Sequence, residues 1–274
     1  MQAIPFTYKT GKIYYRVSGT GSYVLLLHGF GEEGSIWNQT VAHLSEYFTC
    51  IVPDLPGSGN SSMIADMSIE GMADCMKALL DHEKNKRPSP VSNHCVIIGH
   101  SMGGYITLAI AEKHPSILAG IGLFHSTAYA DNEEKKAIRQ KAIEFIGSHG
   151  AAAFLKTSIP GLFSGRPGFK ASDTIVQDLV AKGQLFSAAS LTAYYRAMIE
   201  RPDRTSILSN STFPVLFILG LHDQAIPYQQ ALEQTHLAPM SHVHVLSESG
   251  HMGMLEEAEN CNTILQNFIT SATQ

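Results

Sequence analysis

A serine between two glycines is the part of the sequence that most clearly indicates chemistry. Residues 99–103 read Gly-His-Ser-Met-Gly, with the apolar residues 95–98 before them and the helix-like residues 106–111 after them. A serine on a sharp strand-to-helix turn has a strained backbone, and residues two positions away must lack side chains. Gly99 and Gly103 meet that requirement. The pattern predicts that Ser101 presents a nucleophilic hydroxyl and that the N–H of Met102, at the start of a helix, points to the same space.

A serine hydroxyl at neutral pH needs a base, and the base needs a carboxylate to orient it. Asp223 follows the apolar run 215–219, and His251 follows the run 243–246. Because the carboxyl ends of parallel strands meet at one edge of a sheet, both side chains can converge on Ser101. Their order along the chain, Ser then Asp then His, is one of the known orders for such a triad. The sequence therefore predicts Ser101, Asp223 and His251 as catalytic residues.

Other acidic and imidazole side chains compete for these roles. Glu248 lies close to His251 in the sequence and is the alternative orienting carboxylate. His28 follows the apolar run 23–27, and we expect it to brace the loop there. We expect His100 to line the turn that holds Ser101. Asp54 opens a turn-rich segment and is interpreted as a loop brace.

The sequence contains no strong signal for a metal or a cofactor. His242 and His244 alternate along an expected strand and would share one face, but no third ligand follows at a suitable spacing. No phosphate-binding glycine motif follows a strand. We therefore infer neither a metal nor a cofactor.

Strands and helices are expected to alternate along most of the chain. Apolar runs predict eight strands, at 4–8, 12–17, 23–27, 50–52, 95–98, 118–124, 215–219 and 243–246. Helices are expected at 35–47 and 68–81, and a loop at 84–90. This alternation predicts an α/β fold with a mostly parallel sheet that has helices on both faces.

One long segment departs from the alternation. Residues 126–212 contain no strong strand pattern, but helical patterns recur at 133–146, 174–180 and 190–199. We predict a core made of residues 1–125 and 213–274, with residues 126–212 inserted as a helical cap. Since the insertion leaves from the carboxyl end of a strand, it would lie above the site.

Composition excludes several classes of function. The 274 residues are 44% hydrophobic and 16% charged, and the net charge of −5 gives no electrostatic reason to expect nucleic acid. No apolar run approaches the length of a membrane span, and the first 17 residues lack a signal-like apolar stretch. We expect a cytoplasmic protein that acts on a small molecule. The four cysteines are far apart and are expected to be buried free thiols. The oligomeric state stays open.

Taken together, the motifs resemble the α/β-hydrolase fold family, in its cap-bearing form. They are His28-Gly29, residues 54–61 (Asp-Leu-Pro-Gly-Ser-Gly-Asn-Ser), residues 99–103, residues 220–223 (Gly-Leu-His-Asp) and Gly250-His251. The resemblance implies eight strands and a variable helical cap. It also implies that Ser101 is the nucleophile, His251 the general base and then acid, and Asp223 the orienting carboxylate. The backbone N–H groups of Phe30 and Met102 would form the oxyanion hole.

The strand-to-helix turn at residues 99–103, which we call the elbow, has a serine at its centre, and this residue limits the reactions that the resemblance implies. A serine there, rather than an aspartate, argues against the epoxide-hydrolase and dehalogenase members. Transfer of an acyl group to water through an acyl-enzyme is the expected reaction. Apolar residues of the insertion suggest a small to medium apolar acyl group; these are Phe154, Leu155, Ile159, Leu162, Phe163 and Phe186. A lactonase, a carbon–carbon hydrolase and a non-catalytic ligand receptor of the same fold are the alternatives.

Overall fold

An eight-stranded sheet runs through the centre of the molecule. The structure is a computed structural model, and it describes residues 2–86 and 94–274. The strands are β1 (Ile4–Tyr8), β2 (Gly11–Ser18), β3 (Tyr23–Leu27), β4 (Thr49–Pro53), β5 (Cys95–His100), β6 (Leu118–Phe124), β7 (Val215–Gly220) and β8 (Ser241–Leu246). Their order across the sheet is β1-β2-β4-β3-β5-β6-β7-β8. Strands β1 and β2 are antiparallel to their neighbours, and all other pairs are parallel. The expected fold class is therefore confirmed.

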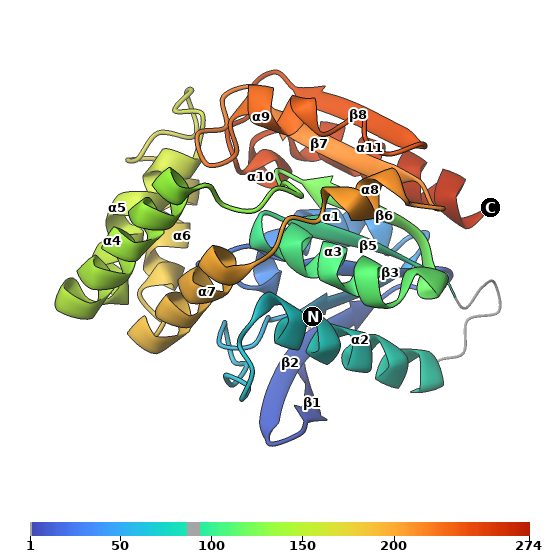
Figure 1. Cartoon of the computed structure of the whole chain (residues 1–274), viewed down its shortest axis with the longest axis horizontal. Coiled ribbons are helices and arrows are strands. Elements are labelled where there is room, and N and C mark those ends of the chain that lie inside the picture. The colour runs from blue at the N-terminus through green and yellow to red at the C-terminus, as the bar shows by residue number, and fades with distance from the viewer. Residues whose placement is uncertain (1, 87–93) are drawn as a thin grey trace.

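Helices cover both faces of this sheet. Figure 1 shows α2 (Ile69–Lys86) and α3 (Met102–Lys113) on the near face, and α1 (Asn38–Leu44) and α11 (Ala258–Thr273) behind it. The central strands β3, β4, β5 and β7 are buried along their whole length, as continuous apolar runs between two helical layers require. Strand β8 is at the edge, and only Leu246 of its residues is buried.

The chain between β6 and β7 is helical, and every residue of it is described. It contains α4 (Glu133–His149), α5 (Ala151–Ser158), the 3-10 turn η3 (Ile159–Leu162), α6 (Thr174–Gly183), α7 (Ala188–Glu200) and α8 (Thr205–Ser209). Helices α4 to α7 gather on one side of the sheet (Figure 1). We call residues 126–212 the helical insertion.

Two helices of the insertion begin at residues whose side chains cap them. Asn132 caps α4 by accepting the N–H of Lys135, and Ser187 caps α7 by accepting the N–H of Ser190. Helix α5 carries no side-chain cap and follows Gly150 at a positive φ of 85°. Helix α5 is not predicted from the sequence, because its eight residues are too few for a clear period.

Several predicted boundaries differ from the structure. The helix expected at 35–47 is divided into the 3-10 turn η1 (Gly34–Trp37) and α1. The helix expected at 68–81 continues to Lys86, so the loop predicted at 84–90 is wrong in its first residues; its later part lies outside the described residues. All four cysteines are buried and free, as predicted. Within residues 2–86 and 94–274, no helix is both long and apolar enough to cross a bilayer.

Candidate active site

Ser101 lies where β5 passes into α3, at the carboxyl edge of the sheet. Its backbone has φ 51° and ψ −116°, a conformation that side-chain-bearing residues rarely adopt. A Cβ at Gly99 would lie 2.2 Å from the carbonyl oxygen of Gly103, and one at Gly103 would lie 2.5 Å from that of Leu27. Side chains at both positions are therefore excluded by backbone atoms, as the motif predicted. A Cβ at Gly104 would likewise meet the Ser126 hydroxyl at 2.2 Å, a constraint that the sequence analysis missed.

Asp223 and His251 come together from two separate loops. Asp223 follows β7 and His251 follows β8, and Nδ1 of His251 lies 2.8 Å from Oδ2 of Asp223. The other carboxylate oxygen, Oδ1, accepts the N–H groups of Ala225 and Ile226 at 2.8 and 2.9 Å. Burial alone would raise the pKa of Asp223, but the neighbouring His251 and hydrogen bonds to its carboxylate lower that pKa well below its usual range. The carboxylate is thus held ionised and in one orientation.

The backbone of His251 is fixed from two sides. Its N–H donates to the carbonyl of Leu162, in the helical insertion, at 2.7 Å. Its carbonyl accepts from Nε2 of His100, in the elbow, at 2.9 Å. His100 therefore does more than line the turn, because it ties the loop after β8 to the end of β5.

Glu32 completes that connection and was not found from the sequence. Its Oε2 lies 3.0 Å from Nδ1 of His100 and accepts the N–H of Gly29 at 2.7 Å. Burial lowers the pKa of His100, but Glu32, the His251 carbonyl and Asp223 together raise it, so the net shift is upward. A charged imidazole with both nitrogens protonated can donate to Glu32 and to the His251 carbonyl at once.

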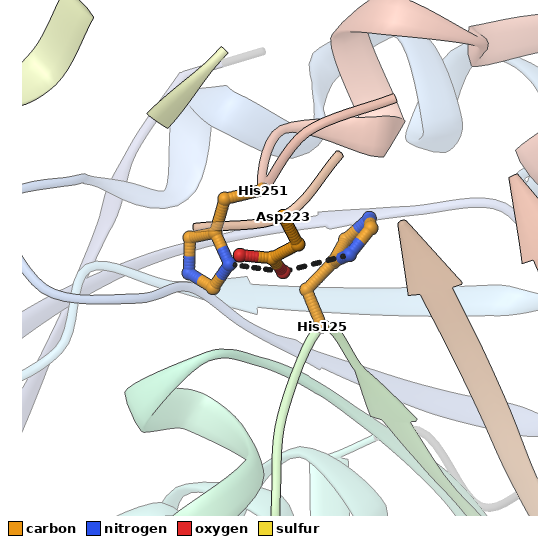
Figure 2. Close-up of side chains that lie close together, drawn as sticks. All are labelled: His125, Asp223 and His251. Carbon is orange, nitrogen blue, oxygen red and sulfur yellow. Dashed lines mark hydrogen bonds and ion pairs between the residues drawn. The ribbon is translucent and has the colours of Figure 1, made fainter. Parts of the chain in front are cut away.

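His125 is a second histidine beside Asp223, and it too was missed. It follows β6 directly, has a φ of 47° and is fully buried. Its Nδ1 lies 3.3 Å from Oδ2 of Asp223. Figure 2 shows Asp223 between the rings of His125 and His251. Burial lowers the pKa of His125 to about 4, so this imidazole is neutral at pH 7. The strand-end rule that selected Asp223 could also have selected His125.

Among the described residues, these three side chains are the group that could hold a metal ion. One ligand atom from each of His125, Asp223 and His251 lies within 4.8 Å of the others. Both Nδ1 atoms, however, approach the same carboxylate oxygen at 2.8 and 3.3 Å. The contact to His251 is a hydrogen bond, whereas neither ring nitrogen of His125 has a hydrogen-bond partner among the described residues. We therefore interpret the trio as a hydrogen-bonded Asp223–His251 pair with His125 packed beside its carboxylate. His242 does not belong to it; its ring packs on Phe268 at 5.4 Å.

The other acidic and histidine residues that the sequence offered for the site make structural contacts instead. Glu248 is on the surface, with 61% of its side chain exposed and an oxygen 3.8 Å from Arg166. Asp54 accepts from Arg16 at 2.8 Å and from the Gly34 N–H at 3.0 Å, which braces the loop as predicted. His28 accepts the N–H of Leu55 through Nε2, so it connects two loops at the edge of the sheet.

Ser101 and His251 line one cavity of about 290 Å³. Asp223 is buried behind it. The other walls come from the loop after β3 (Phe30, Glu32), from α3 (Tyr105), from the helical insertion (Lys135, Ile138, Arg139, Leu155, Ser158, Ile159, Leu162, Tyr195, Met198) and from the loop after β7 (Gln224, Ala225, Ile226). A larger and more open hollow of about 560 Å³ lies between residues 63–68 and α7. We place the site in the smaller cavity because the reactive side chains line it.

The two residues predicted for the oxyanion hole are both close to the Ser101 cavity, since Met102 follows Ser101 directly and Phe30 lines the cavity. Met102 is the first residue of α3 and is fully buried. Phe30 lines the cavity, and its ring stacks on Tyr195 of the insertion at a centroid distance of 4.3 Å. The loop that carries Phe30 therefore contacts both the core and the insertion.

Comparison with known proteins identifies the family. A model of the alpha/beta hydrolase family matches residues 24–263. The pimeloyl-[acyl-carrier protein] methyl ester esterase of Vibrio cholerae is 26% identical over 269 residues, which cover 97% of this chain and 100% of that protein. A thermophilic esterase from Thermogutta terrifontis superposes with a TM-score of 0.90 at 26% identity, covering 100% of both chains. An enol-lactonase from Burkholderia xenovorans has a TM-score of 0.86 at 20% identity and covers 97% of this chain and 100% of that one, which indicates a shared fold. The chain belongs to the alpha/beta hydrolase family.

Proposed function

We propose that this hydrolase cleaves a carboxylic ester, or a related acyl bond, through an acyl-enzyme on Ser101. The observation that carries the proposal is the 2.8 Å contact between Asp223 and His251, directly behind a cavity that His251 shares with Ser101. A buried carboxylate that accepts from Nδ1 keeps the other ring nitrogen, Nε2, available as a base.

The reaction would proceed in two acyl transfers. Ser101 Oγ attacks the carbonyl carbon while its proton passes to Nε2 of His251, and the negative charge develops on the carbonyl oxygen. The backbone N–H groups of Phe30 and Met102 would stabilise that charge. Collapse breaks the ester bond, and His251 returns the proton to the departing alcohol. Water then attacks the acyl-enzyme with His251 again as base, which releases the acid and restores the serine.

The helical insertion would act as the cap over this site. It supplies nine of the 17 residues that line the cavity, and the rings of Phe30 and Tyr195 pack together at the boundary. Its apolar side chains, among them Leu155, Ile159 and Leu162, support a substrate with an apolar acyl portion of small to medium size. The Vibrio cholerae relative is named as a methyl ester esterase, and this name supports an ester over an amide.

A fluorophosphonate probe tests the proposal. We expect it to label the wild-type protein at Ser101 and to leave Ser101→Ala unlabelled. A panel of aryl esters of increasing chain length should be hydrolysed by the wild type alone. Labelling of both proteins, or tight binding of esters without turnover, would contradict the proposal and favour a ligand receptor. Analysis of the products separates ester, lactone and carbon–carbon bond cleavage.

A further inference from the structure

We propose that one end of the cavity is a cationic subsite, formed by Lys135 and Arg139, that binds a carboxylate carried by the substrate. The inference rests on the proposed function and specifies its substrate class. The substrate would be an ester or lactone whose acyl chain is apolar in the middle and anionic at the far end.

The two cations lie together on one face of one helix. Lys135 and Arg139 are four residues apart in α4, which places them one turn apart on the same side. Both line the cavity that contains Ser101 and His251. A substrate that places its carbonyl beside Ser101 can therefore extend toward them without leaving the cavity.

The positive charge at this end exceeds the negative charge. Asp131 pairs with Arg139 through Oδ2 and with Arg201 through Oδ1, the latter at 3.0 Å. Two guanidinium groups thus share one carboxylate. The Lys135 ammonium donates to the carbonyl of Ala225 at 3.0 Å, and within residues 2–86 and 94–274 it forms no ion pair with an acid.

Nearby acids do not balance this surplus. Glu32, which also lines the cavity, is engaged by His100 and the Gly29 N–H. Glu133 pairs with Lys136 at 2.8 Å and its side chain is 91% exposed. Lys135 and Arg139 are only partly buried, so the protein can hold this surplus charge without a ligand, and an anion that enters with the substrate would pair with it.

Carboxylate fits this end in chemistry and in size. Guanidinium and ammonium donors form their strongest hydrogen bonds with carboxylates and phosphates. At about 30 Å³ for each water-sized group, the cavity volume of about 290 Å³ holds about ten non-hydrogen atoms. That is enough for a short acyl chain with a terminal carboxylate.

The test uses paired substrates that differ only in charge. Monomethyl esters of the four- and five-carbon dicarboxylates are each compared with the methyl ester whose far end is the neutral amide. We expect the acid to be preferred over its amide by at least about tenfold in kcat/KM at one or more chain lengths, as a charge-assisted hydrogen bond implies.

Variants of two neighbouring lysines identify the residue responsible. Lys135→Met keeps the apolar stem and should reduce the acid-to-amide ratio about tenfold. Lys135→Arg should retain most of the preference for the acid. Lys136→Met is the control, because Lys136 pairs with Glu133 and does not line the cavity, and it should retain all of the preference. If Lys135 merely held the loop at Ala225 in place, its loss would slow both substrates equally and leave the ratio unchanged.

A binding measurement separates this inference from the proposed function. Calorimetric titration of Ser101→Ala with each dicarboxylate and its diamide requires no turnover. If the diacid binds more tightly than the diamide, and Lys135→Met abolishes this preference, the subsite is supported even when no ester is hydrolysed. In that case only the proposed function fails. Hydrolysis of acid and amide esters at equal rates, with equal binding of diacid and diamide, overturns the subsite and leaves the esterase proposal intact.

Discussion

Replacing Asp223 by asparagine tests whether this carboxylate orients the base. Its Oδ1 accepts the N–H groups of Ala225 and Ile226, so the asparagine would keep its carbonyl oxygen at that position. Its amide NH₂ would then face Nδ1 of His251, which can accept a hydrogen bond only when it carries no proton. The imidazole would be held with its proton on Nε2, where it cannot take the proton of Ser101.

The expected loss follows from the charge and the tautomer together. Two unit charges about 4 Å apart attract each other by about 4 kcal/mol at an effective dielectric constant of about 20, which corresponds to about a thousandfold in rate. Reversal of the tautomer in a comparable triad lowers kcat by about ten thousandfold. We therefore expect Asp223→Asn to lower kcat by about 10³ to 10⁴. KM should change little, because Asp223 does not line the cavity.

Steady-state hydrolysis of an aryl ester measures the effect, with thermal unfolding as the check on the fold. Glu248→Gln is the matched control, because Glu248 was the other candidate carboxylate and is exposed at the surface. It should keep kcat within about twofold. A folded Asp223→Asn protein that retains more than a tenth of the wild-type kcat would refute the assigned role, as would an equal loss in Glu248→Gln.

Two further predictions concern stability. Gly99→Ala should lower the free energy of unfolding by at least about 2 kcal/mol in chemical denaturation, since its Cβ would meet the Gly103 carbonyl at 2.2 Å. The control is Gly147→Ala, which has open space around its Cβ and should raise the free energy of unfolding by about 0.5 to 1 kcal/mol. Similar effects of the two substitutions would contradict a sterically fixed elbow. Burial lowers the pKa of His125 from 6.5 to about 4, so the unfolded chain binds the extra proton between these values and stability falls as the pH drops through this range. From pH 8 to pH 5 this group should cost about 2 kcal/mol, and His125→Asn, which tolerates the positive φ, should remove that loss; an unchanged pH dependence in the variant would count against a buried neutral imidazole.

The sequence could predict the elbow and the pairing partners because their signals are local. Gly99 and Gly103 are required by clashes within a few residues of Ser101, and each strand end is marked by a short apolar run followed by a polar residue. The parallel arrangement then brings Asp223 and His251 to the edge that holds Ser101. The proposed roles of these three residues, and of the N–H groups of Phe30 and Met102, remain predictions that the experiments above test.

What the sequence alone determined about this protein is its fold class, its family resemblance and the positions of the candidate triad, because strand periodicity and turn sterics act over a few residues. Only the tertiary structure decided the rest of the site. Glu32 reaches His100 across 68 positions, and His125 meets Asp223 from a different strand end. Lys135 and Arg139 enter the cavity because the helical insertion packs over the sheet edge. Contacts of this kind depend on how whole elements pack, and no short stretch of sequence encodes them.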